Sequence, residues 1–261
     1  MLVLAVAAGG CSRLGIVNWR LGAIGDEQAR TVLLDALWAH GSTYRWVAHA
    51  GLRAEVTWIE HRTLGDAATD MVWLVDPWGG KVRAERPAEH LVVLADGASL
   101  RVFAEGKETQ DLAARARAAG DVRLAQQLLP MPFSLTAAGV KVASAGLRVG
   151  PGEARLWQRL RVTHGGAAAI GPADRMVVEV RKDTRRVDNV LIRWAGLPFL
   201  GRPMRVEMVE WWELDGLALS RLWRFVPIDE SGKATGPAMY TVRVKRLEFD
   251  AKVPAETFSR P

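Results

Sequence analysis

The sequence contains one cysteine among 261 residues, and the common signatures of catalysis are missing from it. A single cysteine leaves no internal disulfide to constrain the fold. There is no Gly-x-Ser-x-Gly, no His-Glu-x-x-His, no phosphate loop and no glycine-rich dinucleotide fingerprint. The five histidines are scattered, and His49 and His61, which share strand parity, are expected to be exposed strand-face residues. We therefore predict no catalytic residue, no metal site and no cofactor, and we expect that the protein is not an enzyme.

Blocks of like charge and long internal apolar runs are also missing. The formal net charge is +6, yet no block of five or more Lys and Arg residues occurs, and no nucleic-acid-binding motif is present. A generally basic surface without a nucleic-acid partner is therefore expected. No apolar stretch after the amino terminus reaches the roughly 18 residues that a membrane span needs. With 49% hydrophobic and 25% charged residues, the composition is that of a globular protein.

The amino terminus predicts where the protein resides. Residues 2–8 form a short apolar run, and Gly9, Gly10 and Cys11 follow it. Small residues directly before a cysteine resemble the bacterial lipobox, in which a signal peptidase cleaves before the cysteine and that cysteine is then acylated. We therefore predict that residues 1–11 are a lipoprotein signal peptide ending at a lipidated, palmitate-bearing Cys11. The alternative is a free, buried cysteine on a leading apolar strand.

This anchor divides the rest of the chain. Residues 12–25 are predicted to be a tether, and residues 26–261 a single domain. Because Ser12 rather than Asp follows the cysteine, the expected location is the outer membrane, facing the periplasm. The protein would then be held at the membrane by lipid rather than span it.

An amphipathic helix and a long alternating stretch open the domain. Asp26 can cap a helix over residues 27–40, whose apolar residues recur at i, i+3 and i+4. Within residues 44–63, alternation predicts one long strand with Gly51 as a bend. The apolar set comprises Trp46, Ala48, Ala50, Leu52, Ala54, Val56 and Trp58. This strand is the expected partner of the helix's apolar face.

Further alternating segments separated by turn signals predict more of the same sheet. They cover residues 71–75, 81–86, 90–95, 99–104, 140–149, 155–163, 175–181, 187–194, 204–212, 216–226 and 239–249. Residues 111–129 are predicted to be helical, with a break at Gly120 and Asp121. A sheet of about ten strands has to curl or close. The predicted fold class is α+β, mostly β: one strongly curved antiparallel sheet of about 10–11 strands, a half-open β-barrel, with helices lidding its concave face.

Tryptophan makes up most of the aromatic content, with eleven tryptophans against two tyrosines. Most of those on predicted strands share one parity with the apolar residues around them. They are core residues in one interpretation, because aromatic side chains bury large areas. In the other interpretation, some of them line a hydrophobic cavity that the helix does not fill. The predicted cavity residues are Leu33, Leu37, Trp46, Leu52, Val56, Trp58 and Trp73.

The order of these features resembles the outer-membrane lipoprotein-carrier superfamily typified by LolA and LolB. The features are a lipobox, an amphipathic helix, long antiparallel strands, a DPWGGKVR hairpin, a mid-chain helical insert, and a terminal VPAETF. The resemblance implies an open eleven-stranded half-barrel, lidded by helices over a hydrophobic cavity that receives lipoprotein acyl chains. Val253, Pro254 and Phe258 match a common ending of the family's last strand, and Leu33 and Leu37 correspond in role to its cavity-facing helix residues.

An anchored chain is more similar to LolB than to LolA, because a LolA-like carrier has no lipid of its own. LolB also has a protruding apolar loop, and residues 197–200 (Leu-Pro-Phe-Leu) are the candidate for it.

Three classes of function follow from these observations. The first is a monomeric envelope lipoprotein that binds a lipid, or a lipoprotein acyl chain, in an apolar cavity without catalysis. The second is a protein-interaction or sensory module that uses the same concave sheet. The third is an enzyme with an unrecognised site, which would need carboxylates or histidines converging inside the sheet.

Overall fold

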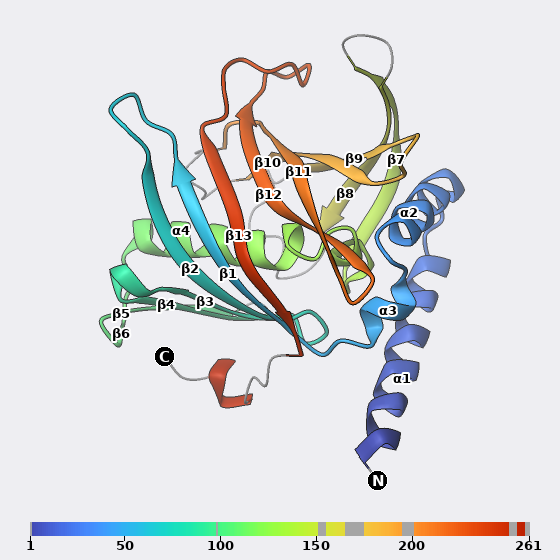
Figure 1. Ribbon diagram of the computed structural model, residues 1–261, viewed down its shortest axis with the longest axis horizontal. Helices are drawn as coiled ribbons and strands as arrows, with labels where there is room; N and C mark the ends of the chain where they lie inside the picture. The colour runs from blue at the N-terminus through green and yellow to red at the C-terminus, as the bar shows by residue number, and fades with distance from the viewer. Residues whose placement is uncertain are drawn as a thin grey trace.

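The computed structural model describes residues 2–97, 99–150, 155–164, 175–194, 201–250 and 255–258, with the side chains described from Ser12 onward except at a few positions beside the gaps. Within these residues, thirteen antiparallel strands form one sheet that does not close (Figure 1). The helices are α1 (Leu2–Gly22), α2 (Glu27–Ala39), α3 (Thr43–Val47) and α4 (Leu112–Arg123). The strands are β1 (Leu52–Glu60), β2 (Ala67–Asp76), β3 (Lys81–Arg86), β4 (Leu91–Asp96), β5 (Ser99–Ala104), β6 (Lys107–Glu108), β7 (Val140–Val149), β8 (Leu156–His164), β9 (Arg175–Arg181), β10 (Val187–Arg193), β11 (Met204–Leu214), β12 (Leu217–Pro227) and β13 (Tyr240–Phe249). The predicted half-open barrel is confirmed, with more strands than expected.

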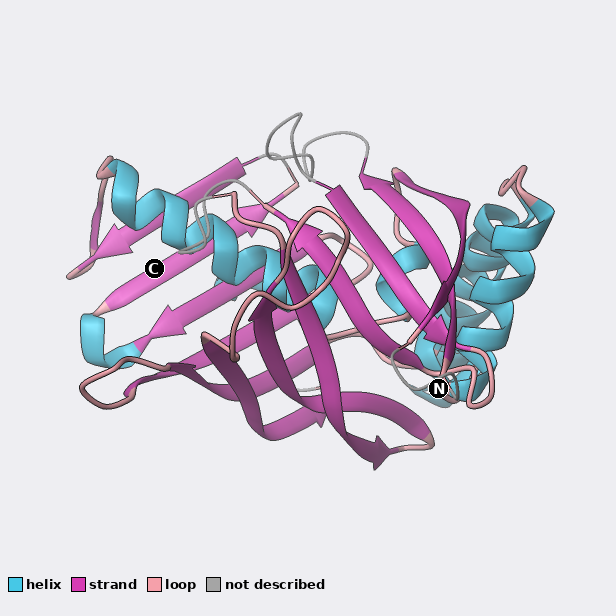
Figure 2. Ribbon diagram, turned by 90° about the horizontal axis from the view of Figure 1, so that it is seen from above, coloured by secondary structure: helices cyan, strands magenta, loops and turns pink. Residues whose placement is uncertain are grey.

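The strand order explains how the hollow of the sheet is filled. The order is β6-β5-β4-β3-β2-β1-β13-β12-β11-β10-β9-β8-β7, so the first and last strands pair in the middle. The chain leaves the sheet at the β6 edge and re-enters it at the β7 edge. Between these edges run α4, a π-helical turn η2 (Leu124–Leu128) and a 3₁₀ turn η3 (Phe133–Thr136). In Figure 2, α4 lies across one half of the sheet, and α1 and α2 stand at the opposite end of the molecule.

The core lies between the concave face of the sheet and this crossing segment. Trp73 of β2 and Trp223 of β12 stack with ring centroids 6.1 Å apart, and both side chains are fully buried. Phe133 and several leucines of the crossing segment pack into the same core. Full burial of such side chains is worth about 1.5–3 kcal/mol each. The half-barrel is therefore a packed structure, closed on the inside by its own chain.

Helix α2 begins where the sequence predicts, but it packs against a different part of the sheet from the one expected. Asp26 accepts a hydrogen bond from the backbone N–H of Ala29 (2.9 Å), as an N-cap does. Its other carboxylate oxygen accepts one from the N–H of Ser144 in β7 (2.7 Å). The apolar face of α2 packs against β7 and β8. The prediction that it covers the strand that follows it was wrong, because the cap ties the helix to the far edge of the sheet.

The predicted strand over residues 44–63 is two elements. Thr43–Val47 is the short helix α3, and β1 begins at Leu52. Trp46 and Val47 of α3 are both buried. From Leu52 to Trp58 the predicted parity holds, with every even position buried.

The predicted break in the mid-chain helix was also wrong. Helix α4 continues through Gly120 and Asp121 to Arg123 and runs directly into the π-helical turn. Asp121 is buried, and its carboxylate pairs with Arg86. Asp121 is of a residue type that favours turns, but here it holds the helix against the sheet.

Gly41 provides a test of the junction between α2 and α3. Its φ is 108°, and a methyl group at this position would overlap the carbonyl oxygen of Gly216. We expect Gly41→Ala to lower the free energy of unfolding by about 2–3 kcal/mol, from backbone strain and overlap together. Gly65→Ala is the control, since φ is 118° there and open space surrounds it. The measurement is urea denaturation. If both variants lose the same free energy of unfolding, the structure relieves the overlap with Gly216 at no cost.

Candidate functional site

An apolar cavity lies at one end of the half-barrel, where α3, the β2–β3 turn and the η2–η3 segment meet. We call it the mouth cavity, and its volume is about 310 Å³. Its walls come from α1, α3, the β2–β3 turn, η2, η3 and β7. The residues that line it include Arg20, Trp46, Trp78, Gln127, Phe133 and Ala138. Its size lies at the lower end of the range for small-molecule sites.

Three aromatic rings form the apolar wall of the mouth cavity. Trp46 stacks on Phe133 with centroids 4.9 Å apart and planes inclined by 10°. Trp78 lies 6.4 Å from Trp46 on the other side, and its indole N–H donates to the carbonyl oxygen of His49 (2.8 Å). The Arg13 guanidinium lies 5.4 Å from the Trp78 ring, within cation–π range. The aromatic groups are therefore held in place before any ligand enters.

The DPWGG turn between β2 and β3 sets the position of Trp78. The Asp76 carboxylate accepts hydrogen bonds from the backbone N–H groups of Trp78 (3.0 Å) and Gly79 (2.8 Å). The Gln126 side chain donates to the carbonyl oxygen of Gly80 (2.8 Å), which ties the turn to η2. The turn that carried part of the sequence resemblance thus builds one wall of the cavity.

A second cavity of about 550 Å³ adjoins the mouth cavity, between the end of α1 and the η3–β7 connection. We call it the α1 cavity. The two share five lining residues: Arg20, Thr136, Ala137, Ala138 and Val140. The Arg20 guanidinium donates to the carbonyl oxygen of Thr136 (2.9 Å) at this shared wall. Desolvation by burial lowers the pKa of Arg20, but an arginine side chain remains charged at neutral pH.

Helix α1 covers this end of the molecule from Ser12 onward. Val17 and Leu21 are buried against the body, and Arg13 donates to the carbonyl oxygen of His49 (3.2 Å). The segment expected to be a tether is therefore helical and packed. The side chain of Cys11 lies outside the described part of the chain, and the division at that residue stays a prediction.

One buried polar atom lies beside the mouth cavity without a partner. Gln127 lines the cavity and is 6% exposed, and its side-chain oxygen Oε1 is buried and accepts no hydrogen bond from any described residue. An unsatisfied buried acceptor costs about 1–3 kcal/mol. The cavity wall is therefore mainly apolar.

All seven predicted cavity residues are buried in the core. Of these, Trp46 alone lines the mouth cavity, and the other six line neither of the two cavities. The η2 turn packs against β2, whereas α2, which carries Leu33 and Leu37, packs against β7 and β8. Phe258 is partly buried, whereas residues 197–200, 253 and 254 lie outside the described ranges. Sequence reasoning missed Phe133 and Gln127, which come from the mid-chain helical segment.

Among the described residues, no group of three or more His, Cys, Asp or Glu side chains is placed to hold a metal ion. Among the same residues, no helix combines the length and hydropathy that a membrane-spanning helix needs.

Solved structures share this fold, although no known protein family and no curated protein matches the sequence. A DUF1329 family protein from Desulfovibrio piger is 13% identical over 88% of this chain and 96% of that chain, with a TM-score of 0.56. A LolA superfamily protein from Nitrosomonas europaea is 12% identical over 88% and 96%, with a TM-score of 0.60. A domain from Vibrio parahaemolyticus, named for outer-membrane lipoprotein sorting, is 12% identical over 88% and 97%, with a TM-score of 0.51. The predicted resemblance to the LolA superfamily is confirmed at the level of the fold.

Proposed function

We propose that this chain is a lipid-anchored protein of the bacterial cell envelope that binds a lipid, or the acyl chain of another lipoprotein, without chemistry. The observation that carries the proposal is the mouth cavity, an aromatic-walled space at the open end of a LolA-type half-barrel. An acyl chain that enters it gains about 0.8 kcal/mol per buried methylene group.

The adjoining α1 cavity supplies the room that a longer chain needs. The Arg20 hydrogen bond to Thr136 lies on the shared wall, so a small displacement of α1 would join the two spaces. The six deeper residues of the predicted cavity are buried in the core and line neither cavity. We therefore place the ligand at the mouth, with Trp46 as the predicted residue that touches it.

Filling the shared wall tests lipid binding directly. Ala138 is exposed and lines both cavities, so Ala138→Trp should lower fatty-acid affinity about tenfold or more with little change in stability. Ala113→Trp, at an exposed position on α4, is the matched control. The measurement is native mass spectrometry with titrated palmitate on chains in which Cys11 is replaced by Ala. Absence of uptake by the parent chain would end the proposal, and equal affinity in both tryptophan variants would move the site elsewhere.

Lipidation of Cys11 is a separate prediction. Cells that produce the chain with an alkyne-labelled palmitate should label it, and Cys11→Ala should abolish the label, because acylation needs the thiol. Ser12→Ala should keep the label, and Ser12→Asp should keep the label but move the protein to the inner-membrane fraction. Label that persists in Cys11→Ala would contradict the lipobox interpretation.

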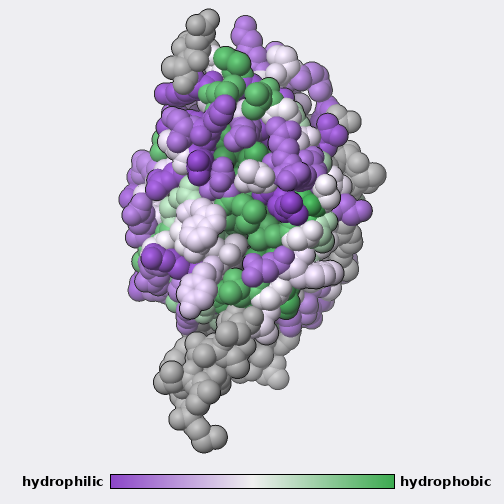
Figure 3. Space-filling view, turned by 90° about the vertical axis from the view of Figure 1, so that its right-hand side faces the viewer, coloured by the Kyte–Doolittle hydropathy of each residue, from purple (hydrophilic) through white to green (hydrophobic). Residues whose placement is uncertain are grey.

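A second candidate function, a protein-interaction module, is favoured by the helical side of the molecule. Trp19 of α1, Trp38 of α2 and Tyr44 of α3 are each more than 70% exposed. Figure 3 views this side and shows hydrophobic side chains gathered in the middle of the face, with hydrophilic ones around them. Exposed apolar groups in one region mark a surface that meets a partner or a membrane. If the parent chain binds no lipid, this surface becomes the site to pursue.

A further inference from the structure

The polar face of the sheet contains a cleft where two neighbouring strands separate. Strands β10 and β11 pair from Asn189 with Glu207 to Ile192 with Met204. Beyond Glu207 the described pairs stop, although β11 continues to Leu214 and its hairpin with β12 is irregular from Met208 onward. The result is a cleft of about 630 Å³ between the β9–β10 turn and the β11–β12 hairpin.

His40, the residue directly after α2, contacts the lining of the cleft. Val187 at the start of β10 donates its backbone N–H to Nε2 of His40 (3.1 Å). The Nδ1–H of the same ring donates to the carbonyl oxygen of Ala218 in β12 (2.8 Å). Trp211 of β11, which lines the cleft, packs edge-on against this ring, with centroids 4.7 Å apart. One buried side chain therefore connects β10 to β12 beside the cleft.

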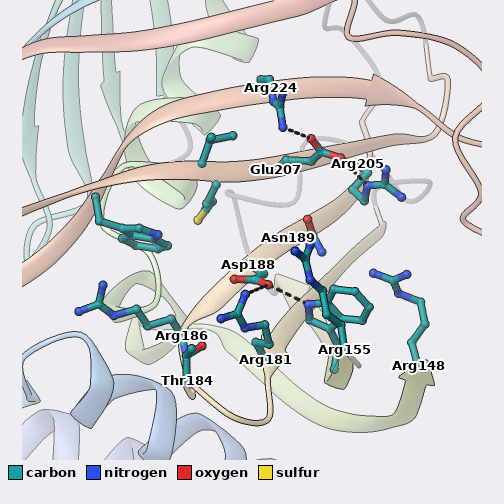
Figure 4. Close-up of a pocket in the computed structure, with 14 residues that line it drawn as sticks. Arg148, Arg155, Arg181, Thr184, Arg186, Asp188, Asn189, Arg205, Glu207 and Arg224 are labelled. Carbon is teal, nitrogen blue, oxygen red and sulfur yellow. Dashed lines mark hydrogen bonds and ion pairs between the residues drawn. The ribbon is translucent and has the colours of Figure 1, made fainter. Parts of the chain in front are cut away.

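Arginine is the main residue type around the cleft. Two carboxylates, Asp188 and Glu207, accompany six arginines: Arg148, Arg155, Arg181, Arg186, Arg205 and Arg224. In Figure 4, Arg205 and Arg224 lie along one wall with Glu207, and Arg181 and Arg186 lie along the facing wall with Asp188. Among the lining residues positive charge exceeds negative charge, and just outside the lining Arg181 also pairs with Asp183 and Arg186 with Glu213.

The carboxylates of Glu207 and Glu179 hold three of these guanidinium groups in place. Glu207 accepts from Arg205 (2.9 Å) and pairs with Arg224 (3.0 Å). Glu179, which is fully buried behind the cleft, accepts from both Nε and Nη2 of Arg148 at 2.6 Å each. The Arg148 guanidinium also lies 4.0 Å from the ring of Trp157. Groups fixed in this way lose little freedom when they bind a ligand.

The cleft has the chemistry of a phosphate site. The planar guanidinium fork matches phosphate geometry and donates two hydrogen bonds at once, each stronger than a neutral one. Met208, Val209 and Trp211 add an apolar strip to the same lining, and Val209 is 41% exposed. An ion-pair network on an ordinary solvated face would leave neither a hollow nor an apolar strip within it.

We propose that this cleft binds a phosphate group, either free or carried by the headgroup of an anionic lipid. The proposal is independent of the mouth cavity, which is formed by different elements. Arg155 and Arg224 are its most suitable test residues, because both side chains are substantially exposed and neither holds the buried Glu179. Replacing them removes charge from the cleft and leaves the buried network intact.

Calorimetric titration of the full chain tests the proposal with two probes, inorganic phosphate and monomeric dihexanoylphosphatidylglycerol. Loss of two charge-assisted hydrogen-bonding groups in Arg155→Gln/Arg224→Gln should weaken binding at least about tenfold. Arg246→Gln removes an equally exposed charge on β13 and should change the affinity less than about twofold. Tighter binding of the lipid than of phosphate, with both lost in the double variant, identifies a headgroup site. Equal affinities identify a free phosphate site.

Three outcomes would overturn the proposal. The first is that neither probe binds with a Kd below about 10 mM. The second is that Arg246→Gln weakens binding as much as the double variant, which would assign the effect to general surface charge. The third outcome combines three results: Ala138→Trp abolishes binding of the lipid, the double variant still binds the lipid, and phosphate does not bind. Together they would place the lipid in the mouth cavity alone.

Discussion

Replacing Asp121 by Ala should lower the free energy of unfolding by about 3–5 kcal/mol, because it leaves the charge of Arg86 largely buried and without its main partner. The two side chains are joined by two hydrogen bonds of 2.9 Å each, from Nε and Nη2 of the guanidinium. Burial raises the pKa of Asp121, and the Arg86 guanidinium opposes that rise. The pair connects α4 to β3, so its loss should also loosen the segment that fills the half-barrel.

A matched set of variants separates the buried pair from an ordinary ion pair. Glu230→Ala removes the partner of Arg193 at an exposed site and should cost less than about 1 kcal/mol. Arg86→Met/Asp121→Leu replaces both charges with apolar groups and should recover most of the loss. The measurement is urea denaturation monitored by tryptophan fluorescence. If Asp121→Ala costs no more than Glu230→Ala, the pair does not hold α4 to the sheet.

The sheet was predictable because its strands follow local rules. Alternation from Leu52 to Trp58 and the turn chemistry of DPWGG depend on neighbouring residues, and both are found as expected. The error at residues 44–47 arose because a single helical turn also buries Trp46, and a short apolar run fits either period.

The candidate site was harder to predict, because it depends on contacts distant in sequence. Parity identifies which residues of β1 and β2 face inward, and all of these are buried. It does not show that residues 124–136, from a separate part of the chain, occupy the space in front of them. Phe133 stacks on Trp46 although 87 positions separate them, as their numbers in the sequence give. Only the meeting of η3 with α3 creates the mouth cavity.

The arginine-rich cleft could not be found from the sequence either. Four of the arginines lie on strands, and Arg155 and Arg186 lie directly before one; at both kinds of position a solvated charge is the usual interpretation. Their convergence follows from irregular pairing near Met208 and from the bridge made by His40. Irregular pairing has no reliable sequence signature, since it reflects the packing of the whole sheet.

Acidification from pH 6.5 to pH 4 should destabilise the protein by about 3 kcal/mol through His40. Burial lowers the pKa of this ring from 6.5 to about 4, and the nearby Arg186 charge adds to the shift, while the hydrogen bond with Ala218 opposes it. Val187 donates to Nε2, so that nitrogen must stay unprotonated in the folded state. The unfolded chain takes up a proton below pH 6.5 and the folded chain only near pH 4. Stability is therefore complete above pH 6.5 and declines as the pH falls towards 4.

His40→Gln isolates this contribution, because glutamine can also donate and accept but does not titrate. We expect it to cost about 1–2 kcal/mol at pH 7.5 from lost packing against Trp211, and to remove most of the decline between pH 6.5 and 4. The two stability curves should then converge or cross near the acidic end. Urea denaturation across this range gives the curves, and the ring resonances of His40 give its pKa in the folded state. A folded-state pKa near 6.5, or an unchanged decline in His40→Gln, would show that the bridge between β10 and β12 tolerates the imidazolium.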